Sequence, residues 1–419
     1  MNKASRKVQR TYLTLLLFNT LAASLIWGIN TLFLLDAGLS NTEAFAANAF
    51  FTLGFMLFEI PTGVIADLRG RRMSYLLGVV TLAISTLLYL LMWYLSAPFW
   101  AWAISSILLG LGFTFFSGAV EAWLADALAS SGFEEKLESV LAKGEIVEGA
   151  AMLTGSVAGG VVAQTTNLGV PYLVRAGLLV LNFIFAFMLM KDLGFKAPGS
   201  KHPIKEVKTI LTNSIEYGLR NAPVRWTMLA APFTGGVTIY AFYAMQPYLL
   251  QLYGDEKAYG IAGVAAAVVA GAQIAGGLLV PYVGRIFGYR TSVLLTAQLV
   301  SVLVLTLIGL IPQFWVAVTL LVLWGLMFSA VMPIRQGYLN ALIPSEQRAT
   351  VLSFDSLFGS SGGVVIQPVL GKAADAWSYQ VSYIFSAGFQ ALAIPFTWLA
   401  RRERAKADAI TSTKEGSHE

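Results

Sequence analysis

Residues 63–72 read "GVIADLRGRR" and place one Asp and three Arg between two long apolar runs. The run before them is "AFAANAFFTLGFMLFEIPT", and the run after them is "MSYLLGVVTLAISTLLYLLMWYL". Each run has the roughly 20 mainly apolar residues that a helix needs to cross the hydrocarbon core of a bilayer. The pattern therefore predicts two membrane helices joined by a short charged turn at the membrane surface.

Composition extends this reading to the whole chain. The 419-residue chain is 57% hydrophobic and only 12% charged, whereas soluble domains carry about 25% charged residues. The net charge of +5 does not predict a nucleic-acid partner, because the basic residues lie in the gaps between apolar runs. The chain has no Cys, and its two His, His202 and His418, lie in polar segments, so we expect neither a disulfide nor a metal site.

Twelve apolar runs are long enough to span a membrane, and each is expected to be a helix because lipid cannot pair with a free backbone amide. The predicted spans are 12–35, 43–66, 73–95, 99–127, 142–164, 172–190, 225–252, 259–284, 291–311, 315–342, 349–371 and 379–400. The fold class is therefore an all-α integral membrane protein.

Lys and Arg are distributed unevenly between the gaps. Most of the 28 basic residues fall in alternate gaps, and the other gaps are assigned only Arg175, Lys257 and Lys372. By the positive-inside rule, this asymmetry predicts a multi-pass protein of the inner (cytoplasmic) membrane with both termini in the cytoplasm.

The chain is expected to divide into two halves. We predict an N-terminal six-helix bundle over 1–190, a cytoplasmic linker over 191–224, a C-terminal bundle over 225–400 and a tail over 401–419. Helically spaced apolar residues in the linker favour an amphipathic helix, with a plain linker as the alternative. The segment "LVPYVGRIFGYR" repeats the opening stretch when Gly288 is aligned with Gly70, and such paired halves are typical of secondary transporters.

The charged turn carries a resemblance to a known family. Gly63, Asp67, Gly70, Arg71 and Arg72 fit the pattern Gly-x-x-x-Asp-Arg-x-Gly-Arg-Arg/Lys of the major facilitator superfamily, with Leu68 replacing the first Arg. The resemblance covers about 12–400 and implies twelve helices in two pseudo-symmetric six-helix bundles that transport by alternating access.

By the same resemblance, these residues form a conformational latch with Asp126, at the inner end of the fourth span. Asp126 is expected to accept a charge-assisted hydrogen bond from Arg71 or Arg72. Gly63 and Gly70 are expected to allow a close approach of the chain. The alternative is that the arginines only anchor the topology.

A second pattern is similar to that of the drug:proton antiporter-like members of the family. Residues 155–160, "GSVAGG", resemble the Gly-Pro-x-x-Gly-Gly signature in the fifth span, with Ser156 replacing the Pro. Ser106 stands where these antiporters often carry an Arg in the fourth span. The alternative reading is close helix packing through small residues, which occurs in any membrane bundle.

Ionisable residues inside the spans are candidates for coupling or gating, because burying them in a membrane is costly. They are Glu59, Glu121, Arg335 and Asp355. The resemblance implies that spans one, four, seven and ten line the central cavity. We therefore hypothesise that Glu121 and Arg335 face each other across it, with a structural pair between Arg335 and Asp355 as the alternative.

The same four spans supply the candidate substrate cavity. Its residues are Trp27, Asn30, Thr114, Ser117, Tyr240, Tyr243, Gln246, Trp324, Phe328 and Met332. An aromatic and Met lining with few charges suits a flat, partly apolar organic molecule. Aromatic stripes that pack against lipid or neighbouring helices are the alternative.

No phosphate-binding loop or metal-ligand cluster is present in the sequence, so an enzyme is not expected. We predict a secondary active transporter that moves a small amphipathic or drug-like solute by proton-coupled efflux. The first alternatives are a proton-linked importer and a uniporter of a metabolite. A membrane sensor or a membrane enzyme comes after them. The expected partners are the solute, protons and membrane lipid, with no cofactor beyond the proton gradient, no nucleic acid and a monomeric state.

Overall fold

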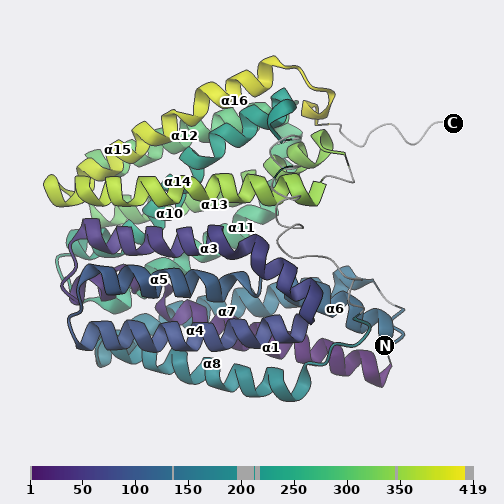
Figure 1. The fold of residues 1–419 in the computed structure, drawn as a ribbon. Helices are drawn as coiled ribbons and strands as arrows, with labels where there is room; N and C mark the ends of the chain where they lie inside the picture. The colour runs from purple at the N-terminus through teal and green to yellow at the C-terminus, as the bar shows by residue number, and fades with distance from the viewer. Residues whose placement is uncertain (1, 135, 196–211, 213–217, 345–347, 411–419) are drawn as a thin grey trace. The chain divides into compact units, whose positions relative to one another are not determined.

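The computed structural model describes the chain apart from residues 1, 135, 196–211, 213–217, 345–347 and 411–419. Every regular element in the described residues is helical, as Figure 1 shows. The segment in which the sequence predicts a linker helix lies largely outside the described residues.

The helices of the first half of the chain are α1 (Lys3–Trp27), α2 (Asn30–Asp36), α3 (Asn41–Arg69), α4 (Arg71–Tyr94), α5 (Phe99–Thr114), α6 (Ala119–Ser130), α7 (Leu137–Thr165) and α8 (Gly169–Leu189). Those of the second half are α10 (Ala222–Tyr253), α11 (Tyr259–Ile286), α12 (Arg290–Leu310), α13 (Phe314–Leu342), α14 (Arg348–Ala376), α15 (Tyr379–Ala391) and α16 (Ala393–Arg402), followed by the short 3-10 helix η2 (Lys406–Asp408).

The described helices supply most of the expected membrane spans. Ten are long and apolar enough to cross a bilayer, and the bent pair α1 and α2 brings the number to 11. The eleventh predicted span, 349–371, coincides with α14, which is long enough but carries Asp355 and a Gly- and Ser-rich stretch over 359–363. That polar content lowers its apolar character relative to the other helices.

Three spans that the sequence predicts as single helices are interrupted. The first bends by 50° between α1 and α2. The fourth breaks between α5 and α6, where Gly118 adopts a left-handed φ of +64°. The twelfth breaks at Leu392 between α15 and α16. The apolar character of the sequence continues across all three interruptions, so hydropathy alone did not predict them.

The first compact unit comprises residues 1–208 and 246–267. In it α1 packs against α7 and α8, α3 against α5, and α4 against α5 and α8. An aromatic core holds it together, with the ring of Phe33 stacked on that of Tyr172 at 3.9 Å between centroids and near the ring of Trp102 at 5.9 Å. The end of α10 and the start of α11, within residues 246–267, belong to this unit although they come from the second half of the chain.

Glycines allow the closest helix contacts in this unit. A Cβ on Gly155 or Gly159 of α7 would overlap Ser24 or Leu25 of α1, and one on Gly160 would lie 2.9 Å from Gly263 of α11. The Gly-rich stretch of the fifth span therefore serves helix packing here, as the alternative reading of the sequence expects.

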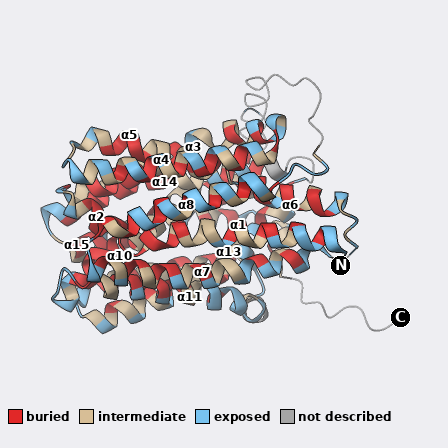
Figure 2. Cartoon of the chain, turned by 90° about the horizontal axis from the view of Figure 1, so that it is seen from below, coloured by how far each residue is buried: buried red, intermediate tan, exposed pale blue. Residues whose placement is uncertain are grey.

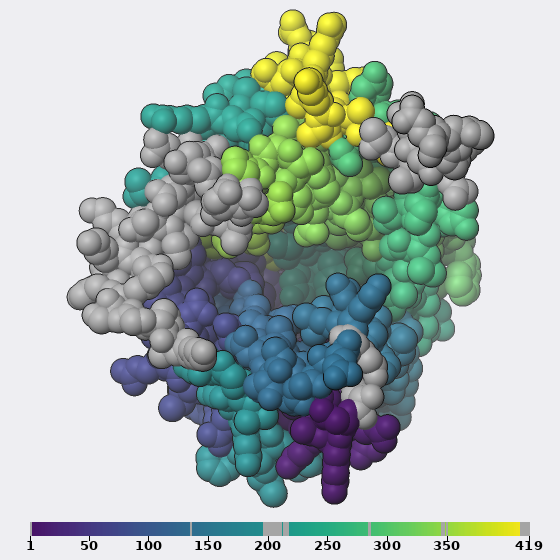
Figure 3. Space-filling model, turned by 90° about the vertical axis from the view of Figure 1, so that its right-hand side faces the viewer, coloured from purple at the N-terminus to yellow at the C-terminus, as the bar shows by residue number. Residues whose placement is uncertain are grey.

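The second compact unit comprises residues 209–245 and 268–419, as far as they are described. Within it α12 packs against α13, α15 and α16, and α14 packs against α15. The last described residues, yellow in Figure 3, lie on the surface of this unit. Ile410 donates its backbone N–H to the carbonyl of Gly288 at 3.0 Å, so the segment that follows α16 is held next to the start of α12 as far as it is described.

Large apolar side chains cover the outer helix faces. On α8, Leu173, Val180 and Phe187 are exposed, whereas Tyr172 and Leu179 are buried, and Figure 2 shows this alternation along the helix. A protein in water does not expose so much apolar surface, so these faces are suited to lipid.

Candidate functional site

Three of the residues predicted to form the latch make an ion cluster where the end of α3 and the start of α4 approach α6. The Nε atom of Arg71 donates to Oδ2 of Asp126 at 3.1 Å, and its NH1 atom lies 3.8 Å from Oδ1 of Asp67. Of the two arginines that the sequence offers to Asp126, Arg71 is therefore the one that binds it.

Arg72 has a different set of partners. Its NH2 atom donates to the carbonyl of Phe187 at 2.8 Å, and its guanidinium lies 5.1 Å from the centre of the Phe187 ring. Its backbone N–H donates to Oδ1 of Asp192 at 2.9 Å. Asp192, which follows α8, was not predicted from the sequence; the available signal is an acid directly after the sixth span.

The two glycines of the charged turn differ. Gly70 has a φ of +98°, and a Cβ on it would lie 2.6 Å from Oδ2 of Asp192, so both conformation and space require glycine. The expectation that Gly63 permits a close approach is wrong, because a Cβ on Gly63 would meet no atom within 4 Å.

Glu59 of α3 lies next to the break between α5 and α6 in the fourth span. Ser117, in the turn between α5 and α6, donates its hydroxyl to Oε1 of Glu59 at 2.5 Å. The other carboxyl oxygen, Oε2, is buried and has no hydrogen-bond partner in the described part of the chain. Glu59 is thus a carboxyl group with one satisfied oxygen and one oxygen open to a proton.

Hydroxyl groups stabilise the same break. Ser74 of α4 donates to the carbonyl of Phe115 at 2.9 Å, whereas the hydroxyl of Thr62 on α3 lies 3.2 Å from the carbonyl of Thr114 but closer, at 2.8 Å, to that of Phe58 in its own helix. The carbonyls of Thr114 and Phe115 lie at the end of α5, where the helix no longer provides a partner. Thr114, predicted to line the cavity, is 1% exposed, and its hydroxyl donates to the backbone carbonyl of Leu111.

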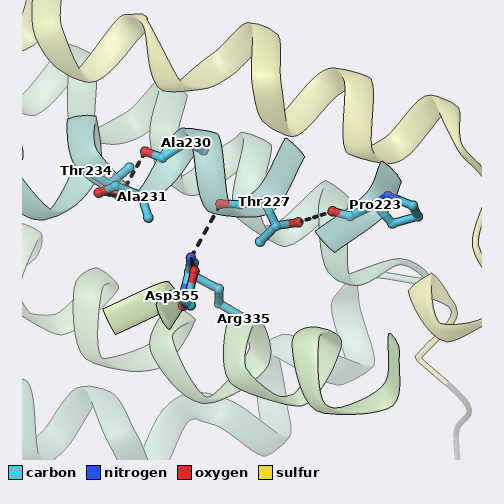
Figure 4. Close-up of polar contacts among 7 residues, drawn as sticks. All are labelled: Pro223, Thr227, Ala230, Ala231, Thr234, Arg335 and Asp355. Atoms are coloured by element: carbon cyan, nitrogen blue, oxygen red, sulfur yellow. Dashed lines mark hydrogen bonds and ion pairs between the residues drawn. The ribbon is translucent and has the colours of Figure 1, made fainter. Parts of the chain in front are cut away.

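Arg335 of α13 binds Asp355 of α14. Both bonds of this bidentate pair, from NH1 and NH2 to the two carboxyl oxygens, measure 2.7 Å, and NH2 also reaches the carbonyl of Thr227 at 3.4 Å (Figure 4). Of the two pairings that the sequence left open for Arg335, the structure contains the one within the second half. Glu121 lies on the exposed side of the first turn of α6 and interacts electrostatically with Glu148 of α7.

Three predicted cavity residues lie at the break in the first span. The side chain of Gln246 donates to the carbonyl of Trp27 at 2.7 Å and accepts the backbone N–H of Thr31 at 2.9 Å. Asn30 donates to Asn48 at 2.9 Å and accepts from Tyr172 at 3.1 Å. The two amides are therefore engaged in holding the interrupted helix.

The remaining predicted cavity residues lie in the second unit. Tyr240 is fully buried in its core and hydrogen-bonds Ser382 at 2.5 Å, whereas Tyr243 is half-buried with its ring against Phe242. Trp324, Phe328 and Met332 line a cavity of about 80 Å³ between α10, α12, α13 and the α15–α16 break. Arg335 also borders this cavity.

The prediction that Arg175 lies at the membrane surface is wrong. It was placed in an outer gap, but it lies inside α8 and is 1% exposed. Its Nε atom donates to Thr86 at 3.0 Å and its NH1 atom to the carbonyl of Ala22 at 3.2 Å. These hydrogen bonds, together with the Phe113 ring 5.9 Å away, supply the polar surroundings that a buried guanidinium needs.

Long apolar helices with interruptions, polar groups at those interruptions and a buried ion pair are features found in helical membrane transport proteins. The family model described as "Major Facilitator Superfamily" matches residues 12–286 and 258–418. The chain belongs to the Major Facilitator Superfamily and is a multi-pass membrane transporter of a small molecule, not an enzyme.

Two curated relatives are named "Multidrug resistance protein MdtG". The chain is 24% identical over 361 residues to the protein of Salmonella typhimurium, covering 84% of this chain and 85% of that one. It is 23% identical over 372 residues to the protein of Salmonella choleraesuis, with the same coverage.

Solved structures share the fold at lower identity. The nucleoside transporter NupG has a TM-score of 0.75 at 12% identity, with 95% of this chain and 99% of that chain covered. A bacterial homologue of the human lysosomal transporter Spinster has a TM-score of 0.74 at 15% identity, with 99% and 100% covered. These structures support the fold and do not identify the solute.

Proposed function

We propose that this transporter exports an amphipathic, drug-like solute across the cytoplasmic membrane in exchange for protons, with both of its termini in the cytoplasm. The names of the MdtG relatives support efflux of such compounds. The observation that carries proton exchange is the carboxyl group of Glu59, which lies at the break in the fourth span and has one buried oxygen without a partner.

Glu59 is suited to carry the proton because protonation at Oε2 needs no rearrangement of its bond with Ser117. The proton adds a donor to an oxygen that has no partner in the described residues. Loss of that proton leaves a charge that water or a moving donor must stabilise, which favours a state in which the break opens. Proton release and movement of the fourth span are thereby coupled.

The cluster of Arg71, Asp67 and Asp126 is the element whose bonds would change as the protein switches state. Its ion pairs are partly exposed and join three helix ends, so water can replace them at modest cost. The Arg335–Asp355 pair is more buried and bidentate, and we assign it a mainly structural role in the second unit.

The test uses purified protein in liposomes with ethidium, a planar amphipathic cation, as the solute. An acidic interior should drive ethidium accumulation by inside-out molecules if protons leave as the dye enters. Glu59→Gln should abolish this accumulation and retain exchange of ethidium between the two sides. Glu256→Gln, a change at an exposed loop residue, is the matched control and should behave like the wild type.

The same measurement separates the alternatives. Accumulation driven by an acidic exterior would identify a proton-linked importer. Flux that is insensitive to the pH gradient in the wild type would identify a uniporter and reject proton exchange. A gradient response that survives Glu59→Gln would reject this residue as the proton carrier.

A further inference from the structure

The cavity in the second unit has an apolar wall and a polar end. The wall includes Trp324 and Phe328, whose rings are nearly parallel at 24° with centroids 6.1 Å apart, and the thioethers of Met327 and Met332. Planar rings and a flexible thioether side chain can contact both faces and edges of a flat apolar group.

The polar end contains two buried glutamines. Gln390 of α15 is 6% exposed, and its amide makes no hydrogen bond to the described residues. Gln298 of α12 is 8% exposed; its Nε2 atom donates to the hydroxyl of Thr397 at 2.8 Å, and its Oε1 atom has no partner in the described part of the chain. Buried polar atoms are nearly always hydrogen-bonded, so Oε1 of Gln298, together with the Gln390 amide that lines the same cavity, points to a partner supplied from outside the chain.

Three threonine hydroxyls around the cavity are already engaged. Those of Thr227, Thr234 and Thr238 donate to backbone carbonyls of α10. The remaining hydrogen-bonding capacity is the complete amide of Gln390, which both donates and accepts, the single acceptor atom of Gln298 and the hydroxyl of Ser301.

The cavity offers no free charged side chain that could bind an ionic ligand. Arg335 borders the cavity, but its guanidinium is matched by the two bonds to Asp355. An added anion or cation would enter a confined space without a free counter-charge, which is unfavourable. The site therefore suits an uncharged group.

We propose that this cavity binds an uncharged planar heterocycle of about one ring that carries an adjacent N–H and C=O. The ring would contact the wall of Trp324, Phe328 and Met332, while its N–H and C=O would pair with the C=O and N–H of the Gln390 amide. The idea that this ring belongs to the transported solute rests on the proposed function. Binding itself requires neither proton exchange nor export.

Calorimetric titration of the purified full chain with 2-pyridone tests the proposal. N-methyl-2-pyridone, which lacks the N–H, should bind about tenfold more weakly, because one net hydrogen bond changes affinity by that order. Gln390→Leu should weaken 2-pyridone binding by a similar factor and remove the difference between the two compounds. Gln336→Leu, at an exposed position of α13, is the control and should leave both affinities unchanged.

A second variant protects the test against loss of folding. Gln390→Met, which keeps most of the side-chain volume but removes the amide, should weaken 2-pyridone in the same way, and thermal unfolding of each variant shows whether it is folded. Absence of 2-pyridone binding to the wild type would overturn the proposal. Equal affinities for the two compounds, or folded glutamine variants that bind like the wild type, would also overturn it. Neither result depends on the pH gradient in the liposome assay, so the two proposals fail separately.

Discussion

Asp192 and Asp408 occupy the same place in the two halves of the chain. Asp192 follows α8 and accepts the backbone N–H of Arg72, the second residue of α4, at 2.9 Å. Asp408 follows α16 and accepts the backbone N–H of Thr291, the second residue of α12, at 2.8 Å. Each acid thereby supplies the N-terminal cap that the helix lacks in its own sequence.

The two caps shift the alignment of the first half of the chain with the second half by one residue, relative to the alignment made from the sequence. The sequence pairs Gly70 with Gly288, but the residue that precedes α12 is Tyr289, so the helix caps pair Gly70 with Tyr289. Arg71 then corresponds to Arg290, which donates to the carbonyls of Ala407 and Ala409. Gly70 has a positive φ and Gly288 does not, so the two glycines are not equivalent in structure.

We expect Asp408→Ala to destabilise the protein more than Asp192→Ala. Asp408 is 4% exposed and also accepts the hydroxyl of Thr291 at 2.6 Å, whereas Asp192 is exposed. Losing the Asp408 cap should cost about 1–3 kcal/mol, and losing the Asp192 cap about 1 kcal/mol or less. Thermal or denaturant unfolding in detergent measures both; equal losses would contradict the ranking.

Within the ion cluster of Arg71, Asp67 and Asp126, Asp126→Asn should loosen the start of α4 and α6 more than Asp67→Asn. The Arg71–Asp126 contact is 3.1 Å, whereas the Arg71–Asp67 contact is 3.8 Å and the Asp67 side chain is 63% exposed. Hydrogen–deuterium exchange of peptides covering 63–72 and 119–130 should rise more in the first variant. The opposite order would show that Asp67 is the stronger partner.

Arg335→Leu should be more damaging than the double change of Arg335→Leu with Asp355→Leu. The single change leaves Asp355, which is 8% exposed, without its counter-charge and should cost about 3–5 kcal/mol. Removing both charges avoids that penalty and should recover part of the loss. Unfolding of the two variants, compared with Asp355→Leu, measures the coupling, and a double variant no better than the worse single one would argue against direct pairing.

Two glycine substitutions should have opposite signs. Gly159→Ala would overlap the carbonyl of Leu25 and force α7 away from α1, at a cost of about 1–3 kcal/mol. Gly177→Ala in α8 meets no atom within 4 Å and should stabilise its helix by up to about 1 kcal/mol. Melting temperatures of the two variants check this; a stable Gly159→Ala protein would show that the helices separate easily.

Gln246→Leu should release the bend between α1 and α2. The change keeps most of the side-chain volume but leaves the carbonyl of Trp27 and the N–H of Thr31 without their partner. Two lost bonds to backbone groups should cost about 2–4 kcal/mol and speed amide exchange at Thr31. Gln251→Leu, at an exposed position of the same helix, is the control; unchanged exchange in Gln246→Leu would mean that the bend does not depend on the amide.

The sequence by itself determined the helical membrane character of this protein, the approximate extent of most spans and the membership of Arg71 and Asp126 in one cluster. The first two properties follow from local information, because runs of apolar residues set where a chain is soluble in lipid and charges interrupt those runs at the surface. The prediction of the cluster followed from the resemblance of the charged turn to the family pattern.

Only the tertiary structure decided the three helix breaks, the choice of Asp355 as the partner of Arg335, the burial of Arg175 and the caps from Asp192 and Asp408. Each depends on residues far apart in the chain that meet through packing. A break is tolerated where neighbouring helices supply the missing hydrogen bonds, as Gln246 and Ser74 do, and the hydropathy pattern does not show such neighbours.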